Sequence, residues 1–213
     1  GLCLDSREVQ PGNVFVALAG QTDHGLAFAE AAINKGAIAV LCDRKFDAYC
    51  QEILSALMTR AICIPVYNLK EKLGEIASRF YQEPSKDLFT VGVTGTDGKT
   101  SVSHFIAQAL DEANHRSAVI GTIGNGIMGR LMPATHTTPD VIQLHRLLTE
   151  LYDTGAESVA MEVSSHGLDQ GRLDAVQLDV AVLTNLGRDH LDYHGDLDAY
   201  AEAKKRLFKQ PGL

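Results

Sequence analysis

The residues best suited to chemistry lie in the segment 91–101, which reads Val-Gly-Val-Thr-Gly-Thr-Asp-Gly-Lys-Thr-Ser. Glycines let backbone N–H groups approach phosphate oxygens, and a helix that begins directly afterwards points its positive end at the same anion. In such a loop Lys99 can reach the β- and γ-phosphates, and the Thr100 hydroxyl can ligate Mg²⁺. The pattern GxxxxGK[ST] is matched incompletely, because Val93 stands where it has glycine. We therefore predict a nucleotide-phosphate loop; the alternative is a glycine-rich turn that only joins a strand to a helix.

Acidic and histidine side chains occur in two later segments, 161–172 and 184–195, and each segment follows an expected strand. Ligand sites in open α/β sheets lie beyond the carboxyl ends of the strands. We therefore expect both segments to converge with the phosphate loop. Mg²⁺ prefers a few protein oxygen ligands together with phosphates and waters. Glu162 and His190 are thus candidates to complete a Mg²⁺ site begun by Thr100 and ATP.

Each of these side chains also has a simpler interpretation. Glu162 at a strand end fits a solvated or ion-paired acid, and His166, His190 and His194 fit surface histidines. His190 and His194 are four residues apart, a spacing that on a helix is typical of zinc ligands. The glycines and asparagine around them predict a loop instead.

Strand-like and helix-like segments alternate along the chain, which predicts an α/β fold with parallel sheets and helices on both faces. The expected strands are 13–19, 37–42, 61–66, 88–94, 117–120, 158–163 and 178–183, and the expected helices are 26–35, 47–58, 69–81, 99–112, 139–153 and 197–208. The glycines between 121 and 129 predict a flexible loop. Pro84 ends the third helix, so we predict a small α/β domain over 1–84 and a parallel-sheet ATP-binding domain over 85–213.

Composition excludes several classes of protein. The 213 residues are 45% hydrophobic and 22% charged, which is typical of a globular protein rather than a disordered one. A net charge of -8 disfavours a nucleic-acid binder, and no apolar run approaches the roughly 18 residues of a membrane span. The four cysteines lack CxxC spacing, so we expect buried thiols of a cytoplasmic protein.

The sequence Thr-Gly-Thr-Asp-Gly-Lys-Thr at 94–100 resembles the ATP loop of the Mur ligases, which build the peptide stem of peptidoglycan; that family usually has Asn at the position of Asp97. The resemblance implies ATP and Mg²⁺ as cofactors, and Lys99, Lys204 and His190 as catalytic residues. The implied metal ligands are Thr100, Glu162 and His190. The implied ATP contacts are Gly95, Thr96, Asp97, Gly98, Lys99, Thr100 and Ser101.

The resemblance extends over nearly the whole chain. Asp-Ser-Arg at 5–7 and Phe-Val-Ala at 15–17 resemble the family's uridine-nucleotide domain, which implies uridine contacts from Leu4, Ser6, Gln21, Thr22 and Asp23. The blocks at 137–139, 164–168 and 185–195 resemble the branch that adds the third residue of the stem. They imply contacts to the muramoyl peptide from His136, Thr137, Thr138, Ser164, Gln170 and Arg172, with His136 replacing a frequent Asn.

Lys204 falls where the family carries a carbamylated lysine (N6-carboxylysine). Addition of CO₂ to a neutral amine turns a cation into a carboxylate-like anion that can ligate Mg²⁺. The alternative is a solvent-facing lysine beside Lys205 and Arg206, where the helix dipole favours positive charge.

The implied activity is ATP-dependent formation of an amide bond. A diamino acid, meso-diaminopimelate or L-lysine, is joined to UDP-MurNAc-L-Ala-D-Glu through an acyl phosphate, by a monomeric enzyme of the bacterial cytoplasm that neither binds nucleic acid nor inserts into membranes. We expect the chain to lack the C-terminal amino-acid-binding domain and the end of the ATP domain, and to be inactive alone. The alternatives are a ligase like folylpolyglutamate synthase and a non-catalytic P-loop nucleotide-binding module.

Overall fold

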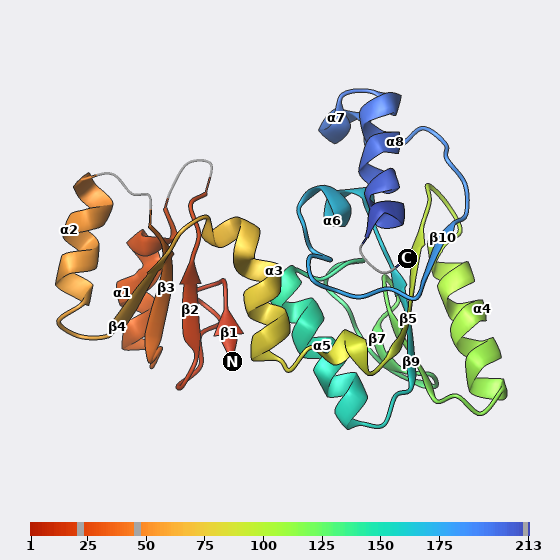
Figure 1. Cartoon of the computed structure of the whole chain (residues 1–213), viewed down its shortest axis with the longest axis horizontal. Helices are drawn as coiled ribbons and strands as arrows, with labels where there is room; N and C mark the ends of the chain where they lie inside the picture. Colours follow the sequence, from red (N-terminus) through yellow and green to blue (C-terminus); the bar gives the residue numbers. More distant parts are fainter. Residues whose placement is uncertain (21–23, 45–47, 211–212) are drawn as a thin grey trace. The chain divides into compact units, whose positions relative to one another are not determined.

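The computed structural model describes residues 1–20, 24–44, 48–210 and 213 (Figure 1). The chain divides into two compact units, Gly1–Leu73 and Gly74–Leu213. The division falls inside helix α3 (Leu69–Phe80), which ends shortly before the predicted domain boundary at residue 84. The assignment of separate nucleotide-binding roles to 1–84 and 85–213 stays a prediction.

The first unit contains a parallel four-stranded sheet in the order β1-β2-β3-β4. Its elements are β1 (Leu2–Cys3), β2 (Val14–Ala17), α1 (Ala29–Asn34), β3 (Ala39–Asp43), α2 (Ala48–Leu57) and β4 (Ile62–Val66). Alternate side chains of the central strands, Phe15 and Val40 among them, pack with Leu54 and Leu57 of α2. Cys42 is buried in this core, and Cys3 and Cys63 are half-buried.

The second unit contains a six-stranded sheet in the order β10-β5-β9-β6-β7-β8, in which β10, β5, β9 and β6 are parallel. Its strands are β5 (Phe89–Thr94), β6 (Ser117–Ile120), β7 (Asn125–Ile127), β8 (Arg130–Met132), β9 (Ser158–Glu162) and β10 (Val180–Leu183). Its helices are α4 (Lys99–Glu112), α5 (Val141–Asp153), α6 (Ser165–Asp169), α7 (Leu191–His194) and α8 (Leu197–Lys205). The predicted α/β class with parallel sheets is confirmed.

Helices α4 and α5 cover opposite faces of this sheet (Figure 1). Successive strand residues point to opposite faces, so Val159 and Met161 of β9 join the core beneath α5, with Leu144 and Leu148. Ala160, between them, packs with Ala107 of α4. The central strands are therefore buried on both faces, which explains their continuous apolar sequences.

Three sequence predictions differ from the structure. The segment expected to be a flexible loop at 121–129 is largely the antiparallel hairpin β7–β8, where a side chain at Gly124 would lie 2.6 Å from the Met132 carbonyl oxygen. Gly124 and Gly126 permit a close backbone approach between the two arms of the hairpin, and Gly129 adopts the positive φ of its turn. The segment after β10 contains the one-turn helix α7, although a loop was expected throughout. The helix expected from Pro139 begins at Val141, because the Asp140 carboxylate accepts the N–H groups of Ile142 and Gln143.

Within the described ranges, no helix has both the length and the apolar character that crossing a bilayer requires.

Candidate active site

The loops that follow β5, β9 and β10 meet at one cavity of about 290 Å³ in the second unit. These three strands are adjacent in the sheet, with Val93 beside Glu162 and Thr94 beside Leu183. The predicted convergence of the loops is therefore confirmed. The cavity is lined by Thr96, Asp97, Gly98, Lys99, Thr100, Thr122, Thr137, Glu162, Ser164, Ser165, His190, Tyr200 and Lys204.

Glu162 is fully buried at the end of β9 and accepts three hydrogen bonds from neutral donors. The Thr100 hydroxyl donates to Oε2 at 2.8 Å, and the Thr122 hydroxyl donates to the same oxygen at 3.1 Å. The Thr122 N–H donates to Oε1 at 2.8 Å. Glu162 forms no ion pair with a described residue, so its charge faces the cavity without a cationic side chain beside it. A buried carboxylate with only neutral partners suits a bound cation, because an isolated buried charge is costly.

Gly121 leaves room for this carboxylate. A Cβ atom at residue 121 would lie 2.1 Å from Glu162 Oε1 and 2.7 Å from Cδ. Any larger residue would displace Glu162 from Thr100.

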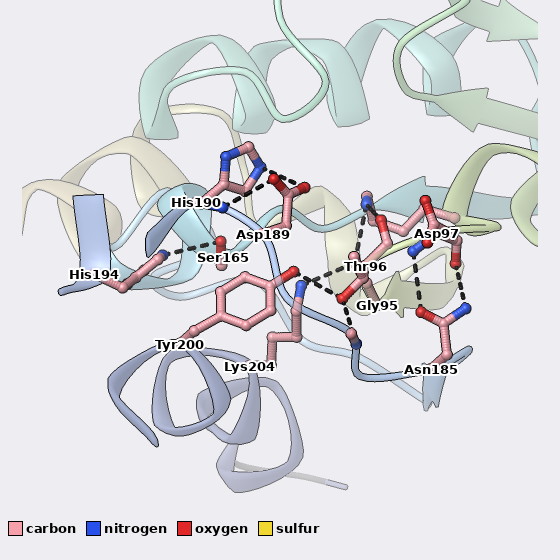
Figure 2. Close-up of polar contacts among 12 residues, drawn as sticks. Gly95, Thr96, Asp97, Ser165, Asn185, Asp189, His190, His194, Tyr200 and Lys204 are labelled. Atoms are coloured by element: carbon pink, nitrogen blue, oxygen red, sulfur yellow. Dashed lines mark hydrogen bonds and ion pairs between the residues drawn. The ribbon is translucent and has the colours of Figure 1, made fainter. Parts of the chain in front are cut away.

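The phosphate loop is held from beneath by residues that follow β10. The side chain of Asn185 pairs with both backbone groups of Asp97: its Oδ1 accepts the N–H at 3.1 Å and its Nδ2 donates to the carbonyl at 3.1 Å (Figure 2). The Thr184 hydroxyl donates to the same carbonyl at 2.6 Å. The Asp97 carboxylate is exposed at the mouth of the cavity.

Two lysines bring positive charge to this loop. Lys99 Nζ, half-buried, donates to the carbonyls of Gly95 at 2.9 Å and Thr96 at 2.8 Å. Lys204 Nζ, on α8, donates to the Gly95 carbonyl at 2.8 Å, and its residue is only 3% exposed. Burial, reinforced by repulsion from the Lys99 ammonium, lowers the pKa of Lys204 to about 8. Lys204 is therefore not solvent-facing. Its ammonium loses its proton at a lower pH than an ordinary lysine does.

His190 lines the cavity just before α7 and forms a cluster of three histidine rings with His166 and His194. The His166 ring lies 4.7 Å from the His190 ring and 5.6 Å from the His194 ring. His194 Nε2 lies 3.0 Å from the Ser165 hydroxyl, and His190 Nε2 lies 3.4 Å from the Asp189 carboxylate (Figure 2). Burial lowers the pKa of both His166 and His194.

The residues expected to bind the muramoyl peptide divide into two groups. Thr137 and Ser164 line the cavity, and buried Thr138 donates to the Glu162 carbonyl at 2.9 Å. Arg172 donates to the Thr138 carbonyl at 2.6 Å and to Gln170 Oε1 at 2.7 Å, but neither Gln170 nor Arg172 lines the cavity. His136 and Ser101 are exposed and also lie outside its lining.

The first unit has a separate cavity of about 790 Å³, and two of the residues expected to bind uridine, Leu4 and Ser6, line it. Its walls are mainly apolar, with Phe15, Val16 and Phe28 among them. The expected contacts Gln21, Thr22 and Asp23 lie outside the described residues.

Sequence reasoning missed several residues that shape the polar cavity. Thr122 holds Glu162, Asn185 holds Asp97, and the Tyr200 hydroxyl lies 3.0 Å from Thr96 Oγ1. The sequence did carry a signal for Tyr200. It precedes Lys204 by four residues and therefore lies on the same face of the helix. The contacts of Thr122 and Asn185 join distant strands and carry no local sequence signal.

Within the described ranges, no group of three or more His, Cys, Asp and Glu side chains is arranged to hold a metal ion by itself. The groups expected to ligate a cation, Glu162, the Thr100 hydroxyl and the His190 ring, all belong to residues that line the cavity, as does the carboxylate of Asp97. A hard cation held by a few protein oxygens and completed by phosphates and water fits this set, whereas a closed zinc site does not.

Comparison with known proteins matches residues 93–212 to the Mur ligase middle domain and residues 1–81 to the Mur ligase family, catalytic domain. The UDP-N-acetylmuramoyl-L-alanyl-D-glutamate--2,6-diaminopimelate ligase of Alkalilimnicola ehrlichii is 52% identical over 215 residues, covering 100% of this chain and 43% of that protein. A solved structure of a ligase with the same description is 42% identical with a TM-score of 0.80, covering 98% of this chain and 40% of its own. The structure of the MurF ligase from Thermotoga maritima in complex with ADP is 27% identical with a TM-score of 0.58. The match covers 98% of this chain and 42% of that one.

The chain thus spans less than half the length of these relatives. The middle-domain match alone covers more than half of its 213 residues and includes the cavity built from β5, β9 and β10. The chain belongs to the Mur ligase family.

Proposed function

We propose that this chain supplies the nucleotide- and substrate-binding parts of a MurE-type ligase. The enzyme would join a diamino acid, 2,6-diaminopimelate or L-lysine, to UDP-MurNAc-L-Ala-D-Glu at the expense of ATP. The observation that carries the proposal is the single polar cavity in which the phosphate loop, Lys99, Glu162 and Lys204 meet. The 52% identity to a diaminopimelate ligase supports the choice of substrate.

In this proposal the loop from Gly95 to Ser101 binds the ATP phosphates. Its backbone N–H groups and the first turn of α4 face the anion, and Lys99, now bonded to loop carbonyls, is close enough to turn toward the terminal phosphates. Because Lys99 and the N-terminus of α4 offset the repulsion between two anions, the cavity can hold a triphosphate beside a carboxylate.

Thr100, Glu162 and His190 would hold Mg²⁺. The cation supplies charge neutralisation between the phosphates and the acceptor carboxylate. The buried charge of Glu162, which has no cationic side chain beside it in the described chain, supports this assignment.

Lys204 would carry a carbamate. Its neutral amine attacks the carbon of CO₂ and releases one proton, which leaves an anion in place of a cation. The 3% exposure of Lys204 and its pKa of about 8 support a larger neutral fraction than an ordinary lysine has at the same pH. The anion formed would lie beside the phosphate loop that its amine now contacts.

Two sets of residues are proposed to contact the UDP-sugar peptide. Leu4 and Ser6, with Gln21, Thr22 and Asp23, are proposed to hold the uridine part. His136, Thr137, Thr138, Ser164, Gln170 and Arg172 are proposed to hold the muramoyl peptide. Thr137 and Ser164 support this assignment best, because they line the cavity that holds the phosphate loop.

The reaction then needs two transfers. A terminal carboxylate oxygen of the dipeptide attacks the γ-phosphorus, and the bond to ADP breaks with its electrons on ADP. The amine of the diamino acid attacks the acyl carbon, inorganic phosphate leaves, and the amine proton passes to solvent. Positioning and charge neutralisation are the protein's main contributions to such chemistry.

We further propose residues 1–84 as the uridine-nucleotide domain and 85–213 as the ATP domain of a monomeric cytoplasmic enzyme that acts on small anionic substrates rather than nucleic acid. The net charge of -8 supports the last point, because a nucleic-acid surface is usually basic.

Calorimetric titration of the wild-type chain tests the proposal. We expect binding of ADP in the presence of Mg²⁺, separate binding of UDP-MurNAc-L-Ala-D-Glu, and no binding of folates. A chain that bound ADP and not the UDP-sugar peptide would instead be a nucleotide-binding module, and binding of a folate would identify the folylpolyglutamate synthase alternative. ¹³C-bicarbonate NMR adds a direct test of Lys204, since the carbamate signal should disappear in Lys204→Ala.

A further inference from the structure

Tyr200 is a buried ionisable group that the proposed reaction does not use. It lies on α8 with 1% of its surface exposed, and its side chain reaches the cavity beside the phosphate loop (Figure 2). Its hydroxyl lies 3.0 Å from Thr96 Oγ1. The same Thr96 oxygen accepts the N–H of Gly187 at 2.8 Å. The Thr96 side chain is therefore held by α8 and by the segment after β10 together.

The ring of Tyr200 makes a second contact. Lys204 lies one helical turn later on the same face of α8, and its Nζ is 4.4 Å from the centre of the Tyr200 ring. In the unmodified form of Lys204, the ammonium over the aromatic face is attracted by the ring. The same Nζ donates to the Gly95 carbonyl. Two side chains of α8, four residues apart, thus hold two consecutive residues of the phosphate loop.

The ring is itself fixed by its neighbours. The His194 ring lies 5.5 Å from it and the His190 ring 6.4 Å from it. A buried aromatic ring held this way has little rotational freedom, so its hydroxyl stays aimed at Thr96.

We propose that Tyr200 is a positioning residue for nucleotide binding: its hydroxyl fixes Thr96 and its ring seats the Lys204 amine, so that the phosphate loop is held in its binding conformation before the nucleotide arrives. A loop ordered in advance does not lose that conformational freedom on binding, and affinity rises accordingly. The inference rests on the proposed function in taking an adenine nucleotide as the ligand.

The test compares Tyr200→Phe, which removes only the hydroxyl, with Tyr152→Phe, the same change at a half-exposed position on α5. Loss of one buried hydrogen bond predicts about a tenfold rise in the Kd for Mg·ADP in Tyr200→Phe. Tyr152→Phe should leave it unchanged. The Kd for UDP-MurNAc-L-Ala-D-Glu should be the same in all three proteins. Equal ADP affinity of Tyr200→Phe and wild type would overturn the inference.

The Thr96 end of the contact gives an independent check. Thr96→Val should weaken ADP binding, whereas Thr96→Ser, which keeps the hydroxyl, should restore it. When Tyr200→Phe is added to Thr96→Val, the Kd for ADP should rise by less than about twofold, because Thr96→Val has already removed the hydrogen bond that the two residues share. Fully additive effects would show that Tyr200 does not act through Thr96. If Tyr200→Phe fails to fold, the ADP affinities of Thr96→Val and Thr96→Ser test the inference by themselves.

A nucleotide-independent measurement separates this inference from the proposed function. Amide hydrogen exchange at residues 95–98 should be faster in Tyr200→Phe than in wild type, at an unchanged global unfolding midpoint. If the wild-type chain bound no ADP, the proposed function would fail while faster exchange still supported the loop-holding role. Unchanged exchange would overturn that role whatever the chain binds.

Discussion

The two cavities of this chain hold their polar groups in different ways. In the second unit, Glu162 and Lys204 are almost completely buried, and neutral hydroxyls, N–H groups and carbonyls hold each of them. In the first unit, the charged pair Asp5 and Arg7 lies at an otherwise largely apolar cavity, and the Arg7 side chain is 86% exposed. The hydrogen bonds from Arg7 lower the pKa of Asp5 to about 2, so this pair is satisfied by itself.

The difference indicates two kinds of recognition. Charges at a buried cavity act more strongly on a ligand than exposed charges do, because solvent screens them less. Exposed charges contribute little, and a wide apolar cavity recognises its ligand by shape and by a few hydrogen bonds. Removal of one charge should therefore be severe in the second unit and mild in the first.

Loss of the loop lysine should have the largest effect. Lys99→Met removes the ammonium that we propose binds the nucleotide phosphates, and we expect ADP binding to weaken on the order of a hundredfold. The matched change in the first cavity is Lys70→Met, which removes an exposed lysine from its wall. Calorimetry should find less than about a fivefold loss of UDP-MurNAc-L-Ala-D-Glu affinity in Lys70→Met. If Lys99→Met lost ADP affinity and Lys70→Met lost UDP-MurNAc-L-Ala-D-Glu affinity by the same factor, the two cavities would not differ in this way.

Substitution of Gly121 should rank second. In Gly121→Ala the new methyl group would contact the Glu162 carboxylate, which must then leave Thr100 and Thr122. We expect unfolding to become easier by about 1–3 kcal/mol, and Mg²⁺ to enhance ADP binding less than in wild type. Urea unfolding and titration with and without Mg²⁺ measure both effects. An unaltered unfolding midpoint would mean that the carboxylate is not tightly held.

A single hydroxyl in the first cavity should matter less. Ser6→Ala removes one hydrogen-bonding group from a wide cavity, and we expect a three- to tenfold loss of affinity for the UDP-sugar peptide, about the worth of one hydrogen bond. ADP affinity should not change. A loss confined to ADP would contradict the assignment of the two cavities.

The smallest expected effect is a pH dependence of the folding stability of the second unit. His145 is fully buried, its Nε2 lies 3.0 Å from the Asp174 carbonyl oxygen, and burial lowers its pKa below 6.5. The folded state therefore disfavours the charged ring, and the stabilisation present above pH 6.5 is lost as the pH falls below that value. We expect a loss of about 1 kcal/mol between pH 7.5 and 5.5.

His145→Gln tests this assignment, since it removes the titrating ring while keeping a polar side chain. The pKa values of the half-buried His166 and His194 are lowered in the same direction, so the informative quantity is the difference in pH dependence between wild type and variant. Identical pH profiles of the urea midpoint would exclude His145 as a contributor.

The sequence predicted the bounds of helices and strands well where residues at the ends of an element mark its start or stop. The predicted bounds of α4 and β6 match the structure, since the glycine-rich loop and Lys99 mark the start of the helix. Glycine was misleading at 121–129, because the sequence does not distinguish a mobile glycine from one that lets two strands approach. The hairpin β7–β8 depends on its pairing with β6, which is a tertiary contact.

The candidate site shows the same limit. The loop from Gly95 to Ser101 is contiguous and was predicted as a unit. The rule that ligand sites lie beyond the carboxyl ends of parallel strands was enough to bring Glu162 and His190 to it. The groups that hold these residues, Thr122, Asn185 and Tyr200, were not predicted. Each makes its contact across the fold, where no periodicity or spacing in the sequence reports it.

The contacts beneath the phosphate loop also set an order of events during synthesis. Residues 95–97 bond to Thr184, Asn185, Gly187, Tyr200 and Lys204, which lie 87 to 109 positions further along the chain. Contacts of such sequence separation form late in folding, because a long stretch of chain must first be closed into a loop. On the ribosome, β5 and α4 emerge well before α8. The nascent chain therefore carries the complete sequence of this loop for some time before the loop acquires its folded shape. The ATP binding that we propose for the loop would be among the last properties this unit gains.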